Sequence, residues 1–404
     1  MTYDVQAVRA DFPSLQQGIA FFDGPGGSQT PAVVAQTIAE TMTSAISNRG
    51  DITSSERRAE RVVQEARAAM GDLLGTHPGG VVFGRSMTAL TYDLARTLAQ
   101  GWGPRDEVVV TSLDHDANIR PWVQAAEAVG ATVRWAQFDP GTGELPLEAV
   151  QEVLTGRTRL VALTAASNVI GTRPDVPAIA AAAREVGALV HVDAVHLAPH
   201  ALVDRVALGA DVISCSPYKF FGPHCGVLAA DPALLETLHP AKLLPSTDRV
   251  PERFELGTLP YELLAGTTAA VDFIADLDPQ ATGDRRARIA ASLATAAEHE
   301  DARSARLEER LREVDGLVSY ARASHRTPTV YFSVDGIESP RLSRHLAAEG
   351  VNAPCSHFYA LEASRRLGLG DTGAVRAGVA AYTDDEDVDR LVDAIHDAVA
   401  ELRC

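Results

Sequence analysis

Two residues near the middle of the chain stand where they could hold and activate a cofactor. Asp193 ends the apolar run Val190–Asp193, and Lys219 follows the next apolar run, D-V-I-S-C-S at 211–216. Because parallel strands present their carboxyl ends at one edge of a sheet, we expect both side chains to meet over one ligand. A buried carboxylate can pair with a pyridine nitrogen, and a lysine can form an imine with an aldehyde. The pair therefore predicts a site for pyridoxal phosphate.

The residues around Lys219 strengthen this prediction. An isolated aspartate usually caps a helix and an isolated lysine is usually solvated, but here F-F-G-P-H follows the lysine and Ser216 precedes it. The segment resembles S-x-x-K-x-x-G-P of the class V aminotransferase family of pyridoxal phosphate enzymes. The chain is most similar to their group II cysteine desulfurases, the selenocysteine lyase-like branch, and the resemblance extends over nearly its whole length.

A phosphate site is expected at the strand–turn–helix segment F-G-R-S-M-T at 83–88. The N-terminus of a helix offers free N–H groups and a positive dipole end to an anion, although alone the segment would indicate an ordinary helix cap. Its resemblance to the family's G-x-T-E implies that the backbone of Met87 and the backbone and hydroxyl of Thr88 bind the phosphate. Ser216 and Tyr218 would complete the cradle.

The cofactor ring has four expected partners. S-L-D-H-D-A-N-I-R-P-W at 112–122 resembles the desulfurase segment E-H-H-A-N-I-x-P-W, which implies that His115 stacks on the ring and moves protons. S-N-V-I-G-T at 167–172 implies that Asn168 contacts the phenolic oxygen or the substrate carboxylate. Asp193 would keep the ring nitrogen protonated. His196 stands where desulfurases usually have glutamine and would donate to the phenolic oxygen.

The resemblance also implies substrate contacts. Arg376, in A-V-R-A-G-V-A-A-Y, would bind the α-carboxylate through its planar guanidinium group. Gly26 and Gly27, in F-D-G-P-G-G-S-Q-T-P, would let the backbone approach the substrate closely. F-E-L-G-T at 254–258 matches a segment that reaches the partner subunit's phosphate, so Thr258 is expected to bind across the interface of a homodimer.

The chain departs from the desulfurase pattern at G-V-N-A-P-C-S-H-F-Y-A, residues 350–360. Aligned with G-I-x-V-R-T-G-H-H-C-A, the sulfur-accepting cysteine falls on Tyr359, while His357 keeps the family's histidine. Cys355 lies four residues earlier. Either the loop has shifted and Cys355 acts as the nucleophile, or persulfide chemistry is absent. We favour its absence, because Gly350 and Ala360 fix the register on both sides.

The combined pattern predicts a desulfurase-like carbon–sulfur lyase. It would act on cysteine, an S-substituted cysteine or a thiol conjugate and give aminoacrylate, then pyruvate and ammonia. The alternatives are an aminotransferase or an epimerase, which need only Lys219, His115 and Arg376. A pyridoxal phosphate-binding scaffold without turnover is less favoured, because a scaffold does not need a carboxylate-binding arginine.

The expected fold is α/β, the pyridoxal phosphate-dependent transferase fold type I. Short apolar runs at 80–83, 107–111, 160–165, 188–193, 211–216 and 226–230 alternate with helix-length segments, which indicates a mostly parallel sheet covered on both faces. Residues 280–314 have the pattern of one long helix, or two with a break. We expect a large domain at 16–265, and a smaller α+β domain formed by 1–15 and 266–404.

Composition restricts the partners. The 404 residues carry a formal charge of −18, which argues against nucleic acid or an anionic membrane as the main partner. No export signal and no apolar run of membrane length is present. The four cysteines lack metal-type spacing and are expected to be reduced thiols of a cytoplasmic protein, with no metal site.

Overall fold

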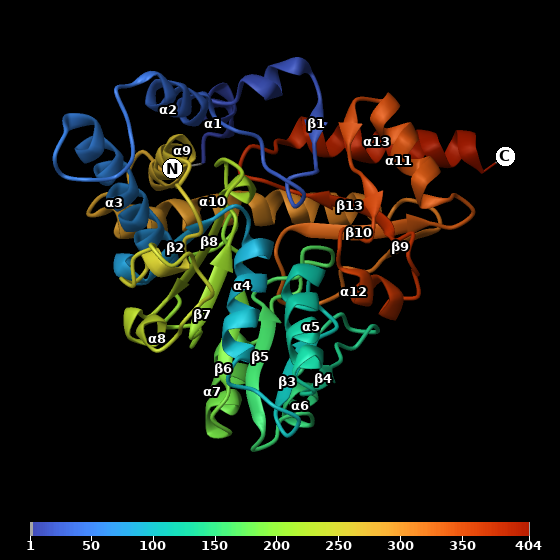
Figure 1. The fold of residues 1–404 in the computed structure, drawn as a ribbon. Helices are drawn as coiled ribbons and strands as arrows, with labels where there is room; N and C mark the ends of the chain where they lie inside the picture. Colours follow the sequence, from blue (N-terminus) through green and yellow to red (C-terminus); the bar gives the residue numbers. More distant parts are fainter. Residues whose placement is uncertain (1–2, 404) are drawn as a thin grey trace.

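A seven-stranded sheet lies at the centre of the larger part of the molecule (Figure 1). The computed structural model describes residues 3–403. In order across the sheet, the strands are β2 (Val81–Gly84), β8 (Gly226–Ala230), β7 (Val212–Cys215), β6 (Leu189–Asp193), β5 (Thr158–Thr164), β3 (Glu107–Thr111) and β4 (Thr132–Ala136). All neighbouring pairs are parallel except the two that involve β8. This confirms the predicted mostly parallel α/β sheet.

Helices cover both faces of this sheet. One face packs on α4 (Met87–Ala99) and α5 (Arg120–Ala128). The other packs on α3 (Ser54–Leu74), α7 (Val176–Glu185) and α9 (Tyr261–Ala275). Local sequence sets the helix ends, as in α7, where the Asp175 side chain accepts from the Ala178 amide at 3.1 Å and Gly187 follows at φ 78°.

A smaller antiparallel sheet follows in the chain and lies beside one end of the large sheet (Figure 1). Its order is β12 (Cys355–Ser356), β13 (Ala374–Gly378), β10 (Thr329–Val334) and β9 (Leu317–Ser319). Helices α11 (Ser339–Ala348) and α13 (Asp385–Leu402) pack on it in a separate apolar cluster. The remaining helices are α1 (Val5–Ala10), α2 (Ala32–Thr43), α6 (Leu147–Gln151), α8 (Pro232–Glu236), α10 (Arg285–Leu311) and α12 (Leu361–Arg366).

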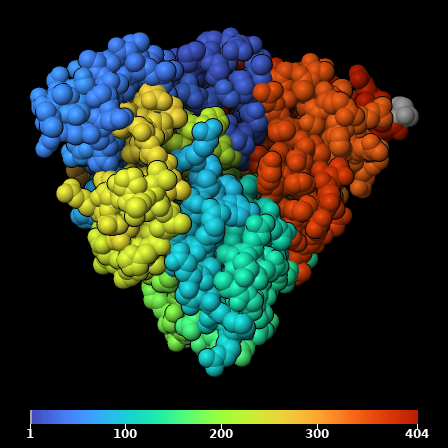
Figure 2. Space-filling model, in the orientation of Figure 1, coloured from blue at the N-terminus to red at the C-terminus, as the bar shows by residue number. Residues whose placement is uncertain are grey.

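The N-terminal segment joins the two parts. Strand β1 (Ala20–Phe21) pairs in parallel with β11 (Val351–Asn352), so a segment from the start of the chain lies beside the C-terminal elements. The boundaries at 16–265 and 266–404 stay a prediction. The space-filling view shows the C-terminal part in close contact with the rest of the chain (Figure 2).

The sequence located six of the seven strands of the large sheet and the long helix of the C-terminal part. Residues 285–311 form one unbroken helix, which resolves the choice between one helix and two. The pattern missed β4, an edge strand whose residues from Thr132 to Trp135 are exposed or half-buried, so that it lacks the continuous apolar run of a central strand. Within residues 3–403, no helix is long and apolar enough to cross a membrane.

Candidate active site

A cavity of about 650 Å³ lies where the carboxyl ends of β6 and β7 meet the loop before α12. It collects most of the residues that the sequence singled out. These are Met87, Thr88, His115, Asn168, Asp193, His196, Ser216, Tyr218, Lys219, Tyr359 and Arg376. Three others, Gly27, His357 and Thr258, are not part of its lining. Segments far apart in sequence therefore converge on one cavity.

Lys219 and Asp193 occupy adjacent strand ends at this cavity. Asp193 is the last residue of β6, and Lys219 ends the short 3-10 helix at Pro217–Lys219 that follows β7. Burial raises the pKa of Asp193 to about 6. Burial, and secondarily the charge of Arg376, lowers the pKa of Lys219 to about 7. A lysine in this range supplies a neutral amine near neutral pH, which suits imine formation and proton transfer.

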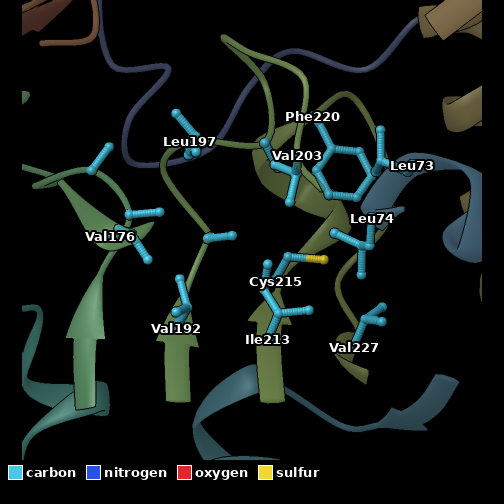
Figure 3. Packing of buried hydrophobic residues seen from close by; sticks show 14 of the residues in the cluster. Leu73, Leu74, Val176, Val192, Leu197, Val203, Ile213, Cys215, Phe220 and Val227 are labelled. Atoms are coloured by element: carbon cyan, nitrogen blue, oxygen red, sulfur yellow. The ribbon is translucent and has the colours of Figure 1, made fainter. Parts of the chain in front are cut away.

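An apolar cluster holds these strand ends in place (Figure 3). Val192, Ile213 and Cys215 are fully buried, and Figure 3 shows them below Phe220, which follows Lys219 directly. Closely packed neighbours restrict how far the backbone can move. The core therefore fixes the carboxylate and the amine relative to each other.

The polar groups at the cavity still have room to bind a ligand. One oxygen of Asp193 accepts from the Val195 amide at 2.9 Å. Lys219 Nζ donates to the carbonyls of Pro25 and Gly26 at 2.6 and 2.9 Å. Among the described atoms, Asn168 Oδ1 is buried without a hydrogen-bond partner. Unsatisfied buried polar atoms around a cavity of this size fit a polar ligand such as pyridoxal phosphate.

The phosphate end has the expected helix geometry. Helix α4 begins at Met87, and its N-cap Ser86 accepts from the Ala89 amide at 3.1 Å. The amides of Met87 and Thr88 lie in the first turn, where no intrahelical acceptor exists. Both residues line the cavity together with Ser216 and Tyr218. This arrangement fits an anion at the helix N-terminus.

Arg376 is buried at the base of the cavity. Its side chain is 1% exposed, and one Nη donates to the Asn168 carbonyl at 2.8 Å. Its Nε has no hydrogen-bond partner among the described atoms. Burial lowers the pKa of Arg376 to about 9. A buried guanidinium with an unused donor suits a substrate carboxylate.

The glycine segment near the N-terminus approaches this arginine through Gly26 rather than Gly27. Gly26 lines the cavity, and a Cβ placed on it would lie 3.2 Å from an Nη of Arg376. A Cβ on Gly27 would instead meet the Tyr218 ring at 3.5 Å. Of the two glycines expected to allow a close backbone approach, Gly26 therefore lies at the cavity, whereas Gly27 lies against Tyr218.

The loop carrying Tyr359 forms one wall of the cavity. Phe358 and Tyr359 have φ of 48° and 59°, a left-handed conformation that is uncommon outside glycine. Two hydrogen bonds hold the loop: Asn168 Nδ2 donates to the Phe358 carbonyl at 2.9 Å, and the Asp116 amide donates to the Tyr359 carbonyl at 2.7 Å. Backbone strain that is fixed by its surroundings is typical of functional sites.

This loop adds aromatic surface to the cavity. The Phe358 ring lies under the Arg376 guanidinium, whose Cζ is 3.7 Å from the ring centroid. The Tyr359 ring stacks on His115 at 5.5 Å between centroids. Burial lowers the pKa of His115 to about 3, so its imidazole is neutral at physiological pH. His115 is thus available as a flat, uncharged stacking surface.

Cys355 lies outside the cavity lining. It belongs to β12, opposite Val375 of β13, and its Sγ donates to the Thr372 carbonyl at 3.9 Å. Burial raises the pKa of its thiol to about 11. A thiol that remains protonated near neutral pH is a poor nucleophile.

The sequence did not single out Phe358 and Tyr92 of the lining, or Asp114, which precedes the lining residue His115. Phe358 lies between two residues of the segment already singled out, so its place in the wall could have been expected. Asp114 precedes His115 and is fully buried, where Thr111 and Asn118 donate to its carboxyl group. Burial raises its pKa to about 8. A single sequence gives no signal for the long-range packing that buries this carboxyl group.

Known proteins resemble this chain along its full length. Residues 20–391 match the family described as aminotransferase class-V. An uncharacterized protein of Mycobacterium tuberculosis is 35% identical over 98% of this chain and 99% of its own. A probable cysteine desulfurase of Pseudomonas aeruginosa is 30% identical over 98% of both chains.

The chain belongs to the class-V aminotransferase family. The crystal structure of the cysteine desulfurase CsdA from Escherichia coli superposes with a TM-score of 0.88 at 25% identity, over 100% of both chains. The predicted family and fold are therefore confirmed. Enzymes of this family depend on pyridoxal phosphate, so this protein is a pyridoxal phosphate-dependent enzyme of the cysteine desulfurase-like type.

Proposed function

We propose that this enzyme is a carbon–sulfur lyase that acts on an S-substituted cysteine. The observation that carries the proposal is the contrast at the loop: Tyr359 lines the cavity, whereas Cys355 lies outside it with a protonated thiol. A phenol cannot carry a persulfide. The sulfur would therefore leave with its own substituent as a thiol instead of passing to the protein.

The cavity residues divide the reaction between them. Bound pyridoxal phosphate supplies an electron sink that stabilises negative charge at the substrate Cα. Arg376 binds the α-carboxylate, and Asp193 holds a proton at the ring nitrogen. Lys219 Nζ takes the Cα proton, and the thiolate leaves from Cβ. The products are a thiol and 2-aminoacrylate, which water converts to pyruvate and ammonia.

The aromatic wall favours a substrate with a substituent on sulfur. Phe358 and Tyr359 add apolar surface at the loop side of the cavity, and Tyr92 of α4 also lines it. Burial of apolar surface contributes about 25 cal/mol per Å². A bulky group on sulfur would gain from this contact.

The remaining binding roles follow the same proposal. Met87, Thr88, Ser216 and Tyr218 would hold the phosphate, and His115, Asn168 and His196 would contact the ring. Gly27 and His357 would support the substrate side from behind the lining. These assignments rest on the resemblance and on where the side chains lie.

A homodimer is part of the proposal. Thr258 is exposed and lies outside the cavity of its own subunit, as a residue that serves a partner's site would. The negative charge and reduced-thiol cysteines are in keeping with a cytoplasmic enzyme whose partner is a small amino acid rather than nucleic acid or membrane.

The test is a substrate screen of the purified, pyridoxal phosphate-loaded protein. Cysteine and a series of S-alkyl and S-aryl cysteines are incubated with it, and pyruvate, thiol, sulfide, keto acids and D-amino acids are measured. We expect pyruvate and thiol in equal amounts from the S-substituted compounds, and none with Lys219→Ala. A keto acid that retains the sulfur would show an aminotransferase, and a D-amino acid an epimerase. No product from any compound would favour the scaffold.

A further inference from the structure

Behind the candidate active site, a histidine and a glutamate form a buried pair. His200 Nδ1 lies 2.8 Å from Glu300 Oε2, and the two side chains are 8% and 2% exposed. His196, which lines the active-site cavity, is the neighbour of His200, with ring centroids 5.3 Å apart. The pair therefore lies directly behind His196, which forms part of the cavity wall.

A small void connects this pair with the reactive lysine. It has a volume of about 10 Å³ and is lined by His196, His200, Lys219 and Glu300 among others. That volume is about the smallest that holds one water molecule, and the lining supplies the polar partners that a buried water needs. A water here would bridge Lys219 and His200.

On its other side, the pair reaches a separate groove. This groove, of about 650 Å³, runs along α10 and is lined by both His200 and Glu300. It shares no lining residue with the active-site cavity. His200 and Glu300 therefore line both the small void next to Lys219 and an opening at a different surface.

We propose that His200 and Glu300 form a proton relay between Lys219 and the solvent of this groove. The inference rests on the proposed function, in which Lys219 takes the Cα proton. The ammonium of Lys219 gives one proton to the bridging water as that water gives one to His200. His200 then passes its Nδ1 proton to the Glu300 carboxylate, which releases it to the groove. This leaves His200 protonated at Nε2 in place of Nδ1. Transfer of a solvent proton in the reverse direction restores the starting tautomer, so the relay exchanges the protons of Lys219 with those of the groove, and no electron is transferred.

The surrounding charges suit this path. Lys219 and Arg376 both disfavour a positive charge on His196, whose pKa lies well below its usual value because of burial. His196 is therefore neutral and held in place, since its Nε2 contacts the hydroxyls of Thr327 and Thr329 at 3.0 and 3.1 Å. His200, rather than His196, is the histidine with a carboxylate partner.

Glu300 lies between His200 and the groove. Burial raises its pKa, whereas the charge and the hydrogen bond of His200 lower it. Tyr3 and Tyr382 also face this carboxylate and feel its charge, and Arg173 lines the groove near Asp301. A carboxyl group that is bonded to His200 and also lines the groove can accept a proton from the histidine and release it to solvent.

The experiment uses L-alanine as a probe in deuterated water. Alanine lacks a leaving group at Cβ, so the holoenzyme can only exchange its Cα hydrogen, which NMR measures directly. In Glu300→Gln, which keeps the shape but cannot carry the proton, we expect exchange to slow at least tenfold. Single-turnover release of thiol, which needs no solvent proton at Lys219, should stay within a factor of two. Asp301→Asn, which removes a groove carboxylate not bonded to His200, should exchange at the wild-type rate.

A second measurement is independent of turnover. In the cofactor-free protein, the Nδ1–H proton signal of His200 should lie downfield because of its bond to the carboxylate. It should move upfield in Glu300→Gln and stay in place in Asp301→Asn. Equal alanine exchange in wild type and Glu300→Gln would overturn the relay. So would a parallel loss of thiol release and exchange, which would mean a structural role. A wild-type holoenzyme that neither exchanges alanine nor releases thiol would instead refute the proposed function.

Discussion

The two sides of the cavity differ in how closely they follow the desulfurase pattern. The side built by the seven-stranded sheet carries the lysine, aspartate and helix N-terminus that such an enzyme needs. The side built by the loop at 354–360 carries a tyrosine in place of the sulfur-accepting cysteine and holds two residues in a left-handed conformation. Under the proposed function, the residues for cofactor chemistry and the residue that decides the fate of the sulfur therefore belong to separate structural units.

The largest effect is expected on the sheet side. Under the proposed function, Lys219→Ala removes both the covalent attachment of the cofactor and the group that takes the Cα proton. General acid–base catalysis by one side chain contributes about 10²–10⁴-fold, so turnover should fall by at least about 10³-fold. The measurement is pyruvate release, together with trapping of the cofactor on the protein by borohydride. Trapping at the wild-type level would remove Lys219 from the site.

Arg376→Ala tests where the two sides meet, because the guanidinium lies on the Phe358 ring and donates to the Asn168 carbonyl. Losing a desolvated charge-assisted contact costs about 2–5 kcal/mol, which corresponds to weaker amino-acid binding by about 30-fold or more. A spectral titration of the bound cofactor with the amino acid measures this. Arg376→Lys keeps the positive charge but cannot donate two parallel hydrogen bonds to the carboxylate, so it should recover only part of the affinity. Unchanged affinity in Arg376→Ala would place the carboxylate elsewhere.

The pH dependence of cofactor binding sharpens the account of the sheet side. Only the neutral amine of Lys219 attacks an aldehyde, and its pKa is lowered from 10.5 to about 7 by burial and by Arg376. The rate of covalent pyridoxal phosphate attachment to the cofactor-free protein should therefore rise with pH around a midpoint near 7. Arg376→Ala removes a positive charge that disfavours the ammonium form, so its midpoint should shift upward. A wild-type midpoint near 10 would contradict the burial of Lys219.

How much the sequence could reveal differs between the two sides in the same way. Apolar runs ending in Asp193 and preceding Lys219 predicted a site that the sheet topology brings together, because parallel strands end at one edge. The alignment also placed Tyr359 at the cavity. The alignment could not show that Cys355 lies in a strand and pairs with Val375, because strand pairing depends on long-range contacts. The buried Asp114 and the aromatic wall arise from packing for the same reason.

A change on the loop side tests whether the missing thiol alone separates this enzyme from a desulfurase. Tyr359→Cys places a thiol where the cavity wall now carries a phenol, next to His115. With cysteine as substrate, this variant should acquire one sulfur atom on residue 359, detected by mass spectrometry of its peptides. Tyr359→Ser is the matched control and should acquire none. If Tyr359→Cys stays free of persulfide while still binding cysteine, the loop geometry as well as the residue type has diverged.

The smallest effect is expected at Cys355. Its thiol is half-buried in β12, its pKa is raised to about 11, and it does not line the cavity. At pH 7 a thiol of this pKa is almost entirely protonated, and only the thiolate attacks sulfur. Cys355→Ser should therefore keep thiol and pyruvate release within about twofold of the wild type, since a conservative change away from the reacting atoms costs little.

Wild-type protein exposed to cysteine should show no added sulfur on the peptide that contains Cys355. An added sulfur there, together with loss of sulfide release in Cys355→Ser, would mean that the loop moves during turnover to bring this thiol to the substrate. In that case the enzyme is a desulfurase whose nucleophile lies four residues earlier in the chain, and the contrast between the two sides of the cavity disappears.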